Sequence, residues 1–334
     1  MPRIMFFAHD PGGANAIAPL VTEFSGSLVF AKGPALPVLW GSKELPENAL
    51  EKYKPDFLLT GTSANDFTER YLWKRAAELG IKSMAVLDFW VNYGIRFSQY
   101  GTKDLSKFAK SCDFLPTWIC VPDELAKKEM VADGVPENII LPLGNPHFEH
   151  IARQAERLGD VKQILTKKPT LITFFSQAFT EDLGQGCEKQ VFEDLLVLAQ
   201  KRSEVAIVLQ KHPKETLAKW EKYSDTNIIV DAKFSTLELL KSSDIVVGIN
   251  SVVLVEAMLL GKRKILSYQL GEKDKTKFVL TRNNSLPFIN NFVDFQVNLN
   301  KCLAGQQTGI YDNPPKTSGV IKAIKEFILK SCLN

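Results

Sequence analysis

Asn250 and Ser251 are two small polar residues that stand between a β-branched run and a helical segment, where a phosphate group can bind. Both are good N-cap residues, so the segment Asp244–Tyr268 predicts a strand, a tight turn and a helix that begins near Val252. The first backbone N–H groups of such a helix carry a partial positive charge. Glu256 lies one turn later on the same face, within reach of ribose hydroxyls. The alternative interpretation is an ordinary capped crossover between two strands.

Two more polar pairs follow predicted strands in the second half of the chain. Ser176 and Gln177 come after an apolar run and can donate hydrogen bonds to a phosphate or a base edge. Lys211 and His212, in QKHPKE, come after the next strand. Lysine supplies a fixed positive charge, and histidine supplies a donor near neutral pH. Both pairs are therefore predicted to contact the phosphates of a nucleotide.

The first loop of the chain, AHDPGGANAIAPL, offers a general base. Asp10 follows a buried strand and can accept a proton from a hydroxyl, with His9 as a competing candidate. Gly12 and Gly13 lack Cβ atoms, so a ligand can approach the backbone there. In the alternative interpretation, Asp10 only satisfies the backbone amides of the turn.

A second carboxylate, Asp88, follows another predicted strand in LDFWVNYGIRF. Trp90, Tyr93 and Arg96 surround it in the sequence. Aromatic rings beside a carboxylate suit an acceptor or donor sugar, because rings cover C–H faces while the acid binds hydroxyls. These residues suit a domain core equally well, so both interpretations stay open.

Several missing patterns narrow the chemistry. The sequence has no DxD pair to hold a metal against a diphosphate, and its four histidines form no HExxH. We therefore predict no metal site and no resident cofactor. The first loop is not GxGxxG, which disfavours NAD, and there is no Walker A loop or GxSxG elbow.

These residues must be positioned by two α/β domains, because short apolar runs alternate with amphipathic segments along the whole chain. We predict two Rossmann-like open parallel-sheet domains that face a central cleft. Residues 1–150 form an acceptor-side domain, 151–168 a linker, 169–316 a nucleotide-donor domain, and 317–334 a helix that can cross back to the first domain. The predicted strands are 4–8, 57–60, 84–87, 118–121, 139–141, 171–175, 206–209, 228–230, 245–247 and 264–267. The helices predicted between them include 14–24, 67–79, 124–133, 188–201, 216–223, 236–241 and 252–260.

Composition is that of an ordinary soluble globular protein, with 334 residues, 45% hydrophobic and 24% charged. The net charge of +3 argues against a dedicated nucleic-acid binder. Residues 151–334 carry 26 Lys and Arg against 20 Asp and Glu, whereas residues 1–150 carry 15 against 18. The second half is therefore the better host for an anion.

The sequence also bears on location. Its five cysteines are an odd number without a CxxC spacing, which favours a reducing compartment. We find no signal-peptide pattern and no apolar run of membrane-spanning length. We expect a cytoplasmic protein, and contact with a membrane surface stays open. The sequence does not indicate an oligomeric state.

Four segments, LGNPHFEH, FFSQ, KHP and NSVVLVEAMLLGK, together resemble the GT-B superfamily of glycosyltransferases and UDP-N-acetylglucosamine 2-epimerases. The KHP element is also similar to the His-Pro motif of bacterial sialyltransferases and related enzymes that use CMP-activated donors, although their acidic motif is not evident. The resemblance implies that the second domain holds the nucleotide and that transfer needs no metal. It further implies that Lys211 and His212 neutralise the leaving phosphate, that Ser251 binds it, and that Glu256 binds ribose.

The combined prediction is a metal-independent glycosyltransferase. It would move a sugar from a nucleotide-sugar donor, of UDP or CMP type, to a glycan or other hydroxyl acceptor in polysaccharide or glycoconjugate biosynthesis. One alternative is a nucleotide-sugar 2-epimerase or hydrolase of the same fold. An alternative of another class is a non-catalytic protein that binds nucleotide sugars.

Overall fold

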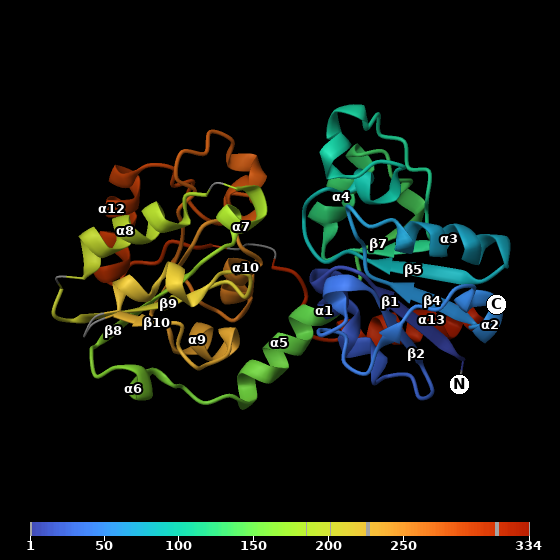
Figure 1. Cartoon of the computed structure of the whole chain (residues 1–334), viewed down its shortest axis with the longest axis horizontal. Helices are drawn as coiled ribbons and strands as arrows, with labels where there is room; N and C mark the ends of the chain where they lie inside the picture. Colours follow the sequence, from blue (N-terminus) through green and yellow to red (C-terminus); the bar gives the residue numbers. More distant parts are fainter. Residues whose placement is uncertain (1, 185, 201, 225–227, 311–313, 334) are drawn as a thin grey trace. The chain divides into compact units, whose positions relative to one another are not determined.

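The computed structural model describes residues 2–184, 186–200, 202–224, 228–310 and 314–333, and it divides the chain into two units (Figure 1). Unit 1 comprises Met1–His150 with Pro315–Asn334, and unit 2 comprises Ile151–Pro314. Helix α5 (Pro146–Arg157) begins in unit 1 and ends in unit 2. The segment 151–168 therefore holds the end of α5 and the short helix α6 (Lys162–Leu165).

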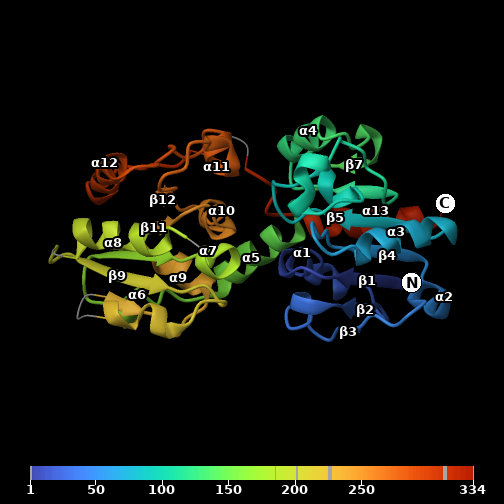
Figure 2. The same ribbon diagram turned by 45° about the horizontal axis from the view of Figure 1, so that its top comes forward.

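Unit 1 contains a seven-stranded sheet in which every recorded strand pair is parallel. Figure 2 shows the strands stacked from β3 at one edge to β7 at the other. In sheet order they are β3 (Lys43–Glu44), β2 (Leu28–Ala31), β1 (Ile4–Ala8), β4 (Phe57–Thr60), β5 (Lys82–Val86), β6 (Trp118–Cys120) and β7 (Ile140–Leu141).

Helices cover both faces of this sheet, as a buried parallel sheet requires. The buried side chains of α1 (Pro11–Val21) and α13 (Val320–Leu333) share one core with alternate strand residues, while α3 (Thr68–Glu78) contacts β4 and β5. The Ile321 N–H of α13 donates to buried Glu149 at 2.8 Å, and Lys82 donates to the Ser331 carbonyl. The C-terminal helix therefore packs within unit 1. The other helices of this unit are α2 (Ala49–Tyr53) and α4 (Glu124–Ala132), with 3₁₀ turns at Gly33–Ala35, Gly94–Phe97, Thr102–Lys107 and Glu137–Ile139.

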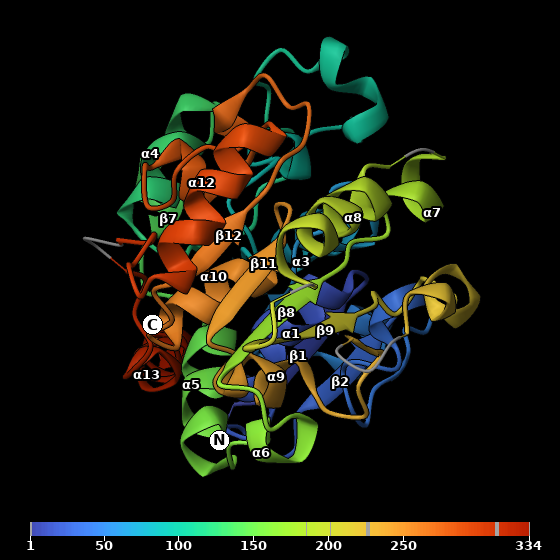
Figure 3. The same ribbon diagram turned by 90° about the vertical axis from the view of Figure 1, so that its left-hand side faces the viewer.

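Unit 2 contains a five-stranded parallel sheet. Figure 3 shows α8 (Glu188–Ala199) and α12 (Phe292–Leu303) on one side of it, with α9 (Thr236–Ser242) and α10 (Val252–Leu259) on the other. In sheet order the strands are β10 (Ile228–Val230), β9 (Val205–Gln210), β8 (Thr170–Phe175), β11 (Ile245–Gly248) and β12 (Ile265–Ser267). Short elements are α7 (Phe179–Leu183), α11 (Val279–Arg282) and 3₁₀ turns at Leu217–Lys219, Glu221–Tyr223 and Lys275–Lys277.

Local structure departs from the sequence prediction in several places. Helix α1 begins at Pro11 rather than Ala14, because a proline at the first helical position needs no hydrogen-bond partner for its nitrogen. Strands β2 and β3 and helices α2 and α12 were not predicted. The helix predicted at 216–223 is two 3₁₀ turns, which bury Trp220 completely. Within the described ranges, no helix is long and apolar enough to cross a membrane.

Candidate functional site

Unit 2 gathers its predicted phosphate contacts at the carboxyl ends of three adjacent strands. Strands β9, β8 and β11 are neighbours and parallel, so the residues that follow them share one edge of the sheet. The Gln177 amide group donates to Asn250 Oδ1 at 2.9 Å, and the Asn250 N–H donates to Gln177 Oε1 at 2.8 Å. These reciprocal bonds join two loops that are 73 residues apart in the sequence.

Helix α10 begins at this edge in the way the sequence predicts. Ser251 is its N-cap and accepts from the Val253 N–H at 3.3 Å, and the first turn contains no acidic residue. The helix end therefore keeps its partial positive charge without a protein anion beside it in the first turn. Glu256 lies in the second turn of α10 and is partly buried. Its ribose contact stays a prediction.

Lys211 and His212 follow β9 at the same edge. The Lys211 ammonium lies 3.9 Å from an Asp231 carboxylate oxygen, and one fifth of the lysine side chain is exposed. His212 Nδ1 accepts from the Lys214 N–H at 3.2 Å, so the neutral imidazole carries its proton on Nε2. Burial lowers the pKa of His212, although Glu215 opposes this shift. At neutral pH, His212 therefore offers an uncharged N–H donor and Lys211 a full charge.

A buried carboxylate that sequence analysis did not single out, Glu215, holds this edge together. It accepts from the Ser176 hydroxyl at 2.9 Å and from the His212 N–H at 2.7 Å. Glu215 therefore ties the end of β8 to the end of β9. The Ser176 hydroxyl is already bonded within the protein, and its predicted phosphate contact stays a prediction. Glu215 belongs to the motif QKHPKE, but its contacts with Ser176 and His212 could not be predicted from the sequence.

The charge of Glu215 is balanced by Lys219, whose ammonium lies among three carboxylates. It is 2.7 Å from Glu215, 2.7 Å from Glu188 and 3.1 Å from Glu181. Burial acts to lower the pKa of Lys219, but hydrogen bonds to these carboxylates outweigh it and raise the pKa. The three carboxylates have the spacing of a cation site. Lys219 already supplies the positive charge there.

In unit 1, the predicted bases His9 and Asp10 form a pair after β1. His9 Nδ1 lies 2.7 Å from Asp10 Oδ1, and His9 Nε2 lies 3.6 Å from Asp66 Oδ2. The Asp10 side chain is 38% exposed, so an outside hydroxyl can reach it. Asp10 makes no side-chain cap of α1, contrary to the alternative in which it only satisfies turn amides. An imidazole between two carboxylates can relay a proton.

A further carboxyl group, Glu69 of α3, binds the backbone of His9, and sequence analysis did not single it out. One of its oxygens accepts from the His9 N–H at 3.1 Å, and the other is buried without a hydrogen-bond partner among the described residues. Burial raises the pKa of Glu69 to about 8, with a small opposing contribution from the His9 N–H. The carboxyl is therefore mostly protonated at neutral pH. No spacing in the sequence relates residues 60 positions apart.

Gly12 and Gly13 lie against other parts of unit 1. A Cβ atom on Gly12 would come 2.0 Å from Asp88 Oδ2, and one on Gly13 would come 3.0 Å from the Gly61 backbone. Any side chain at Gly12 would displace Asp88. Close packing within the protein thus explains both glycines, and their approach to a ligand stays a prediction.

Asp88 and the aromatic residues after it are held by internal contacts. Arg96, which is 6% exposed, donates to Asp88 Oδ1 and to Thr62 Oγ1, both at 2.8 Å. Trp90 is 1% exposed and donates to the Asp123 carboxylate at 3.0 Å, while the Tyr93 hydroxyl donates to Glu129. These rings belong to the core of unit 1. Contact of Trp90, Tyr93 and Arg96 with a sugar, and the role of Asp88 as a base, stay predictions.

Comparison with known proteins identifies the fold. Residues 145–314 match the family described as "Protein of unknown function (DUF354)". No curated protein matches the sequence. The solved structure of UDP-GlcNAc 2-epimerase from Neisseria meningitidis bound to UDP-GlcNAc is similar, with 14% identity, a TM-score of 0.67, and coverage of 98% of this chain and 100% of that chain.

Two further solved structures agree. A putative UDP-N-acetylglucosamine 2-epimerase from Listeria monocytogenes has 15% identity and a TM-score of 0.70, covering 98% of this chain and 96% of that one. Anabaena Alr3699/HepE in complex with UDP and glucose has 12% identity and a TM-score of 0.62, covering 99% and 100%. The chain therefore has a GT-B-like fold of two parallel-sheet domains, which confirms the predicted fold class and the resemblance. The likeness of KHP to CMP-sugar enzymes stays a prediction.

We expect Lys219→Met to destabilise the protein by about 3–5 kcal/mol, because it leaves buried carboxylates without their positive partner. Urea unfolding measures the change. Lys222→Met is the matched control: this nearby lysine is 63% exposed and lies 3.8 Å from Glu193, so its loss should change the free energy of unfolding far less. Equal costs for the two variants would contradict the account of the buried cluster.

We expect Glu69→Gln to flatten the dependence of stability on pH. Below its ordinary pKa of 4.5, Glu69 is protonated in the folded and unfolded chain alike. As the pH rises from 4.5 to about 8, only the unfolded chain loses this proton, so the free energy of unfolding falls by up to about 1.4 kcal/mol per pH unit. Glutamine cannot ionise, which removes this contribution.

Urea unfolding at a series of pH values tests this expectation. Glu78→Gln, on the same helix at a position about half exposed, serves as control and should keep the pH dependence of the unmodified chain. The free energies of unfolding of Glu69→Gln and the unmodified chain could instead differ by a constant amount from acid to alkaline pH. This outcome would show that burial does not raise the pKa of Glu69.

Proposed function

The chain belongs to the DUF354 family of proteins of unknown function, and we propose that it is an enzyme that transfers a sugar from a nucleotide-sugar donor to a hydroxyl acceptor without a metal ion. Nucleotide-sugar chemistry is supported by the fold, since structures of this fold include one bound to UDP-GlcNAc and one bound to UDP and glucose. The phosphate site and the general base are proposed from the residues at the sheet edges of this chain.

The observation that carries the proposal is the edge of unit 2 where β9, β8 and β11 end. It brings together the Lys211 ammonium, the bonded pair of Gln177 and Asn250, and the start of α10. A cation beside the positive end of a helix suits a phosphate. We assign the phosphates of the nucleotide to this edge and propose that Lys211 neutralises the charge that develops on the leaving group.

Unit 1 offers the base for the acceptor. We propose that Asp10 accepts the proton of the attacking hydroxyl while the acceptor oxygen bonds to the anomeric carbon. The bond from that carbon to the nucleotide phosphate breaks, and its electron pair leaves with the phosphate. His9, hydrogen-bonded to Asp10 at 2.7 Å, fixes the orientation of the carboxylate. Asp66 lies 3.6 Å from the other ring nitrogen, so the imidazole stands between two carboxylates.

No step in this proposal is assigned to a metal ion. The sequence has no DxD pair. The three carboxylates of unit 2 that have the spacing for a cation surround Lys219. Lys219 pairs with one of them, Glu215, which in turn accepts from the His212 backbone N–H. The positive charge at the phosphate edge comes from Lys211 and the helix start.

A second candidate function is a change to the donor alone, by 2-epimerisation or hydrolysis. Its support is that several solved structures that match nearly the whole chain are UDP-GlcNAc 2-epimerases. Both candidates use the same nucleotide edge. They differ in whether a second substrate is needed for turnover.

We expect Lys211→Met to weaken nucleotide binding by about tenfold or more, because it removes a charged contact with phosphate. Isothermal titration with UDP, CMP and their sugars measures the affinity. Lys214→Met is the matched control: this lysine is 60% exposed and bonded to Asp182, and its loss should leave the affinity unchanged. Failure of every nucleotide to bind the unmodified chain would overturn the proposal.

Asp10→Asn separates binding from chemistry. It should leave nucleotide affinity intact and reduce transfer to an acceptor by about a hundredfold or more. Incubation of the unmodified chain with each nucleotide sugar alone identifies the second candidate, because a new or free sugar would form without an acceptor. Binding of nucleotides with no turnover under either condition would favour a non-catalytic binding protein.

A further inference from the structure

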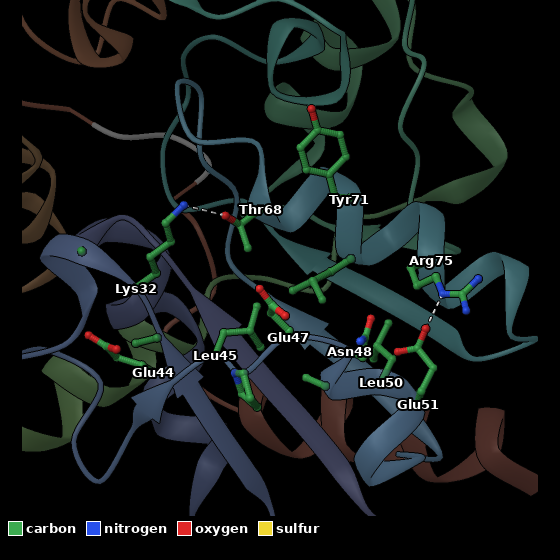
Figure 4. A pocket seen from close by; sticks show the side chains of 15 residues that line it. Lys32, Glu44, Leu45, Glu47, Asn48, Leu50, Glu51, Thr68, Tyr71 and Arg75 are labelled. Carbon is green, nitrogen blue, oxygen red and sulfur yellow. Dashed lines mark hydrogen bonds and ion pairs between the residues drawn. The ribbon is translucent and has the colours of Figure 1, made fainter.

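Unit 1 contains a pocket of about 800 Å³ that none of the residues proposed for catalysis lines (Figure 4). It lies between the carboxyl end of β2, the segment that joins β3 to α2, and the outer face of α3. Its volume is in the range of roughly 300–1,000 Å³ that is usual for small-molecule sites. A compact organic ligand of the size of one or two sugar rings fits such a space.

The floor of the pocket is apolar. Leu50 and Leu72 are nearly fully buried, and Leu45 also belongs to the lining. Tyr71 lies at the rim, but its ring points away from Glu47 and Leu50 (Figure 4) and contacts Phe114 edge to face, with centroids 5.8 Å apart. The leucines therefore supply the apolar surface against which ring carbons of a ligand can pack.

The positive charges around the pocket are already neutralised. Lys32, at one end, is bonded to Asp66 at 2.8 Å and to Thr68 at 3.0 Å. Arg75, at the other end, is bonded to Glu51 at 2.5 Å and to Glu78 at 2.8 Å. Both cations are therefore already paired with carboxylates of the protein.

The negative charge of the pocket is not neutralised in the same way. Among the residues that the structure describes, neither Glu44 nor Glu47 has a hydrogen-bond or ion-pair partner for its carboxylate. Figure 4 shows the Glu47 carboxylate in the middle of the lining, between the Lys32 end and the Arg75 end. A ligand that lies on the apolar floor therefore contacts an unpaired carboxylate in the middle of the pocket.

We propose that this pocket binds a sugar-sized ligand with a protonated amino group, such as an amino sugar. The leucine floor packs against the ring carbons of the ligand, and Glu47 pairs with the ammonium group. A neutral sugar of the same size gains the packing but not the ion pair. An anionic ligand is disfavoured by Glu44 and Glu47.

The pocket adjoins the proposed base. Gly33 lines it, and a Cβ atom on Gly33 would come 2.9 Å from His9 Nε2. Lys32 is joined through Asp66 to the same imidazole. The binding itself does not depend on the proposed function; only the further step, in which the bound amino sugar is the acceptor, rests on that function.

Calorimetric titration with glucosamine, without any nucleotide, tests the proposal. At about pH 6, where its amine is protonated, glucosamine should bind about three- to fivefold more tightly than glucose or N-acetylglucosamine. Glu47→Gln should abolish this preference and leave the affinity for the two neutral sugars unchanged. Glu124→Gln, an exposed carboxylate outside the pocket, is the matched control and should retain the preference.

Thermal unfolding of each variant checks that the chain still folds. Equal affinities for charged and neutral sugars, or no sugar binding, would overturn the proposal. UDP titrations on the same samples separate the two proposals. Lost sugar binding with intact UDP binding overturns only the pocket, and the reverse overturns only the nucleotide function.

Discussion

Parallel pairing of the strands is the constraint on which both units depend. A parallel sheet needs a crossover after each strand, and the crossover helices bury both faces of the sheet. In unit 1, α1 and α13 therefore share a core with one face while α3 covers the other. The same pairing directs all carboxyl ends toward one edge. Loops that are far apart in the sequence meet there, as the 73-residue separation of Gln177 and Asn250 shows.

A buried carboxyl group joins the loops in each unit, and the two units stabilise that group in different ways. In unit 2, Glu215 bonds to both Ser176 and His212, and its charge is balanced by Lys219 within the same buried cluster. In unit 1, Glu69 accepts from the His9 backbone N–H, and burial raises the pKa of Glu69 to about 8, so this carboxyl stays largely neutral. A paired ion and a protonated acid are the two physical ways to bury a carboxyl group.

Local sequence predicted what depends on local rules. The strand 245–247 and the N-cap at Ser251 follow from periodicity and capping, and the structure confirms them. The partners of the site residues could not be predicted, because Glu69 and Glu215 act through contacts that no spacing rule describes. The helix predicted at 216–223 is wrong for the same reason: burial of Lys219 and Trp220 overrides the helical propensity of that segment.

Aromatic residues show most clearly why type and spacing do not settle function. Trp90 and Tyr93 stand beside a carboxylate in the sequence, yet both are buried and bonded to Asp123 and Glu129. Tyr71 stands at the same spacing from a carboxylate, Glu69, but its side chain stays 60% exposed at the rim of a pocket. A ring can contact a ligand only where packing leaves its face open. Exposure therefore decides between these residues, and exposure is set by how α3 lies on the sheet rather than by the residues next to each ring.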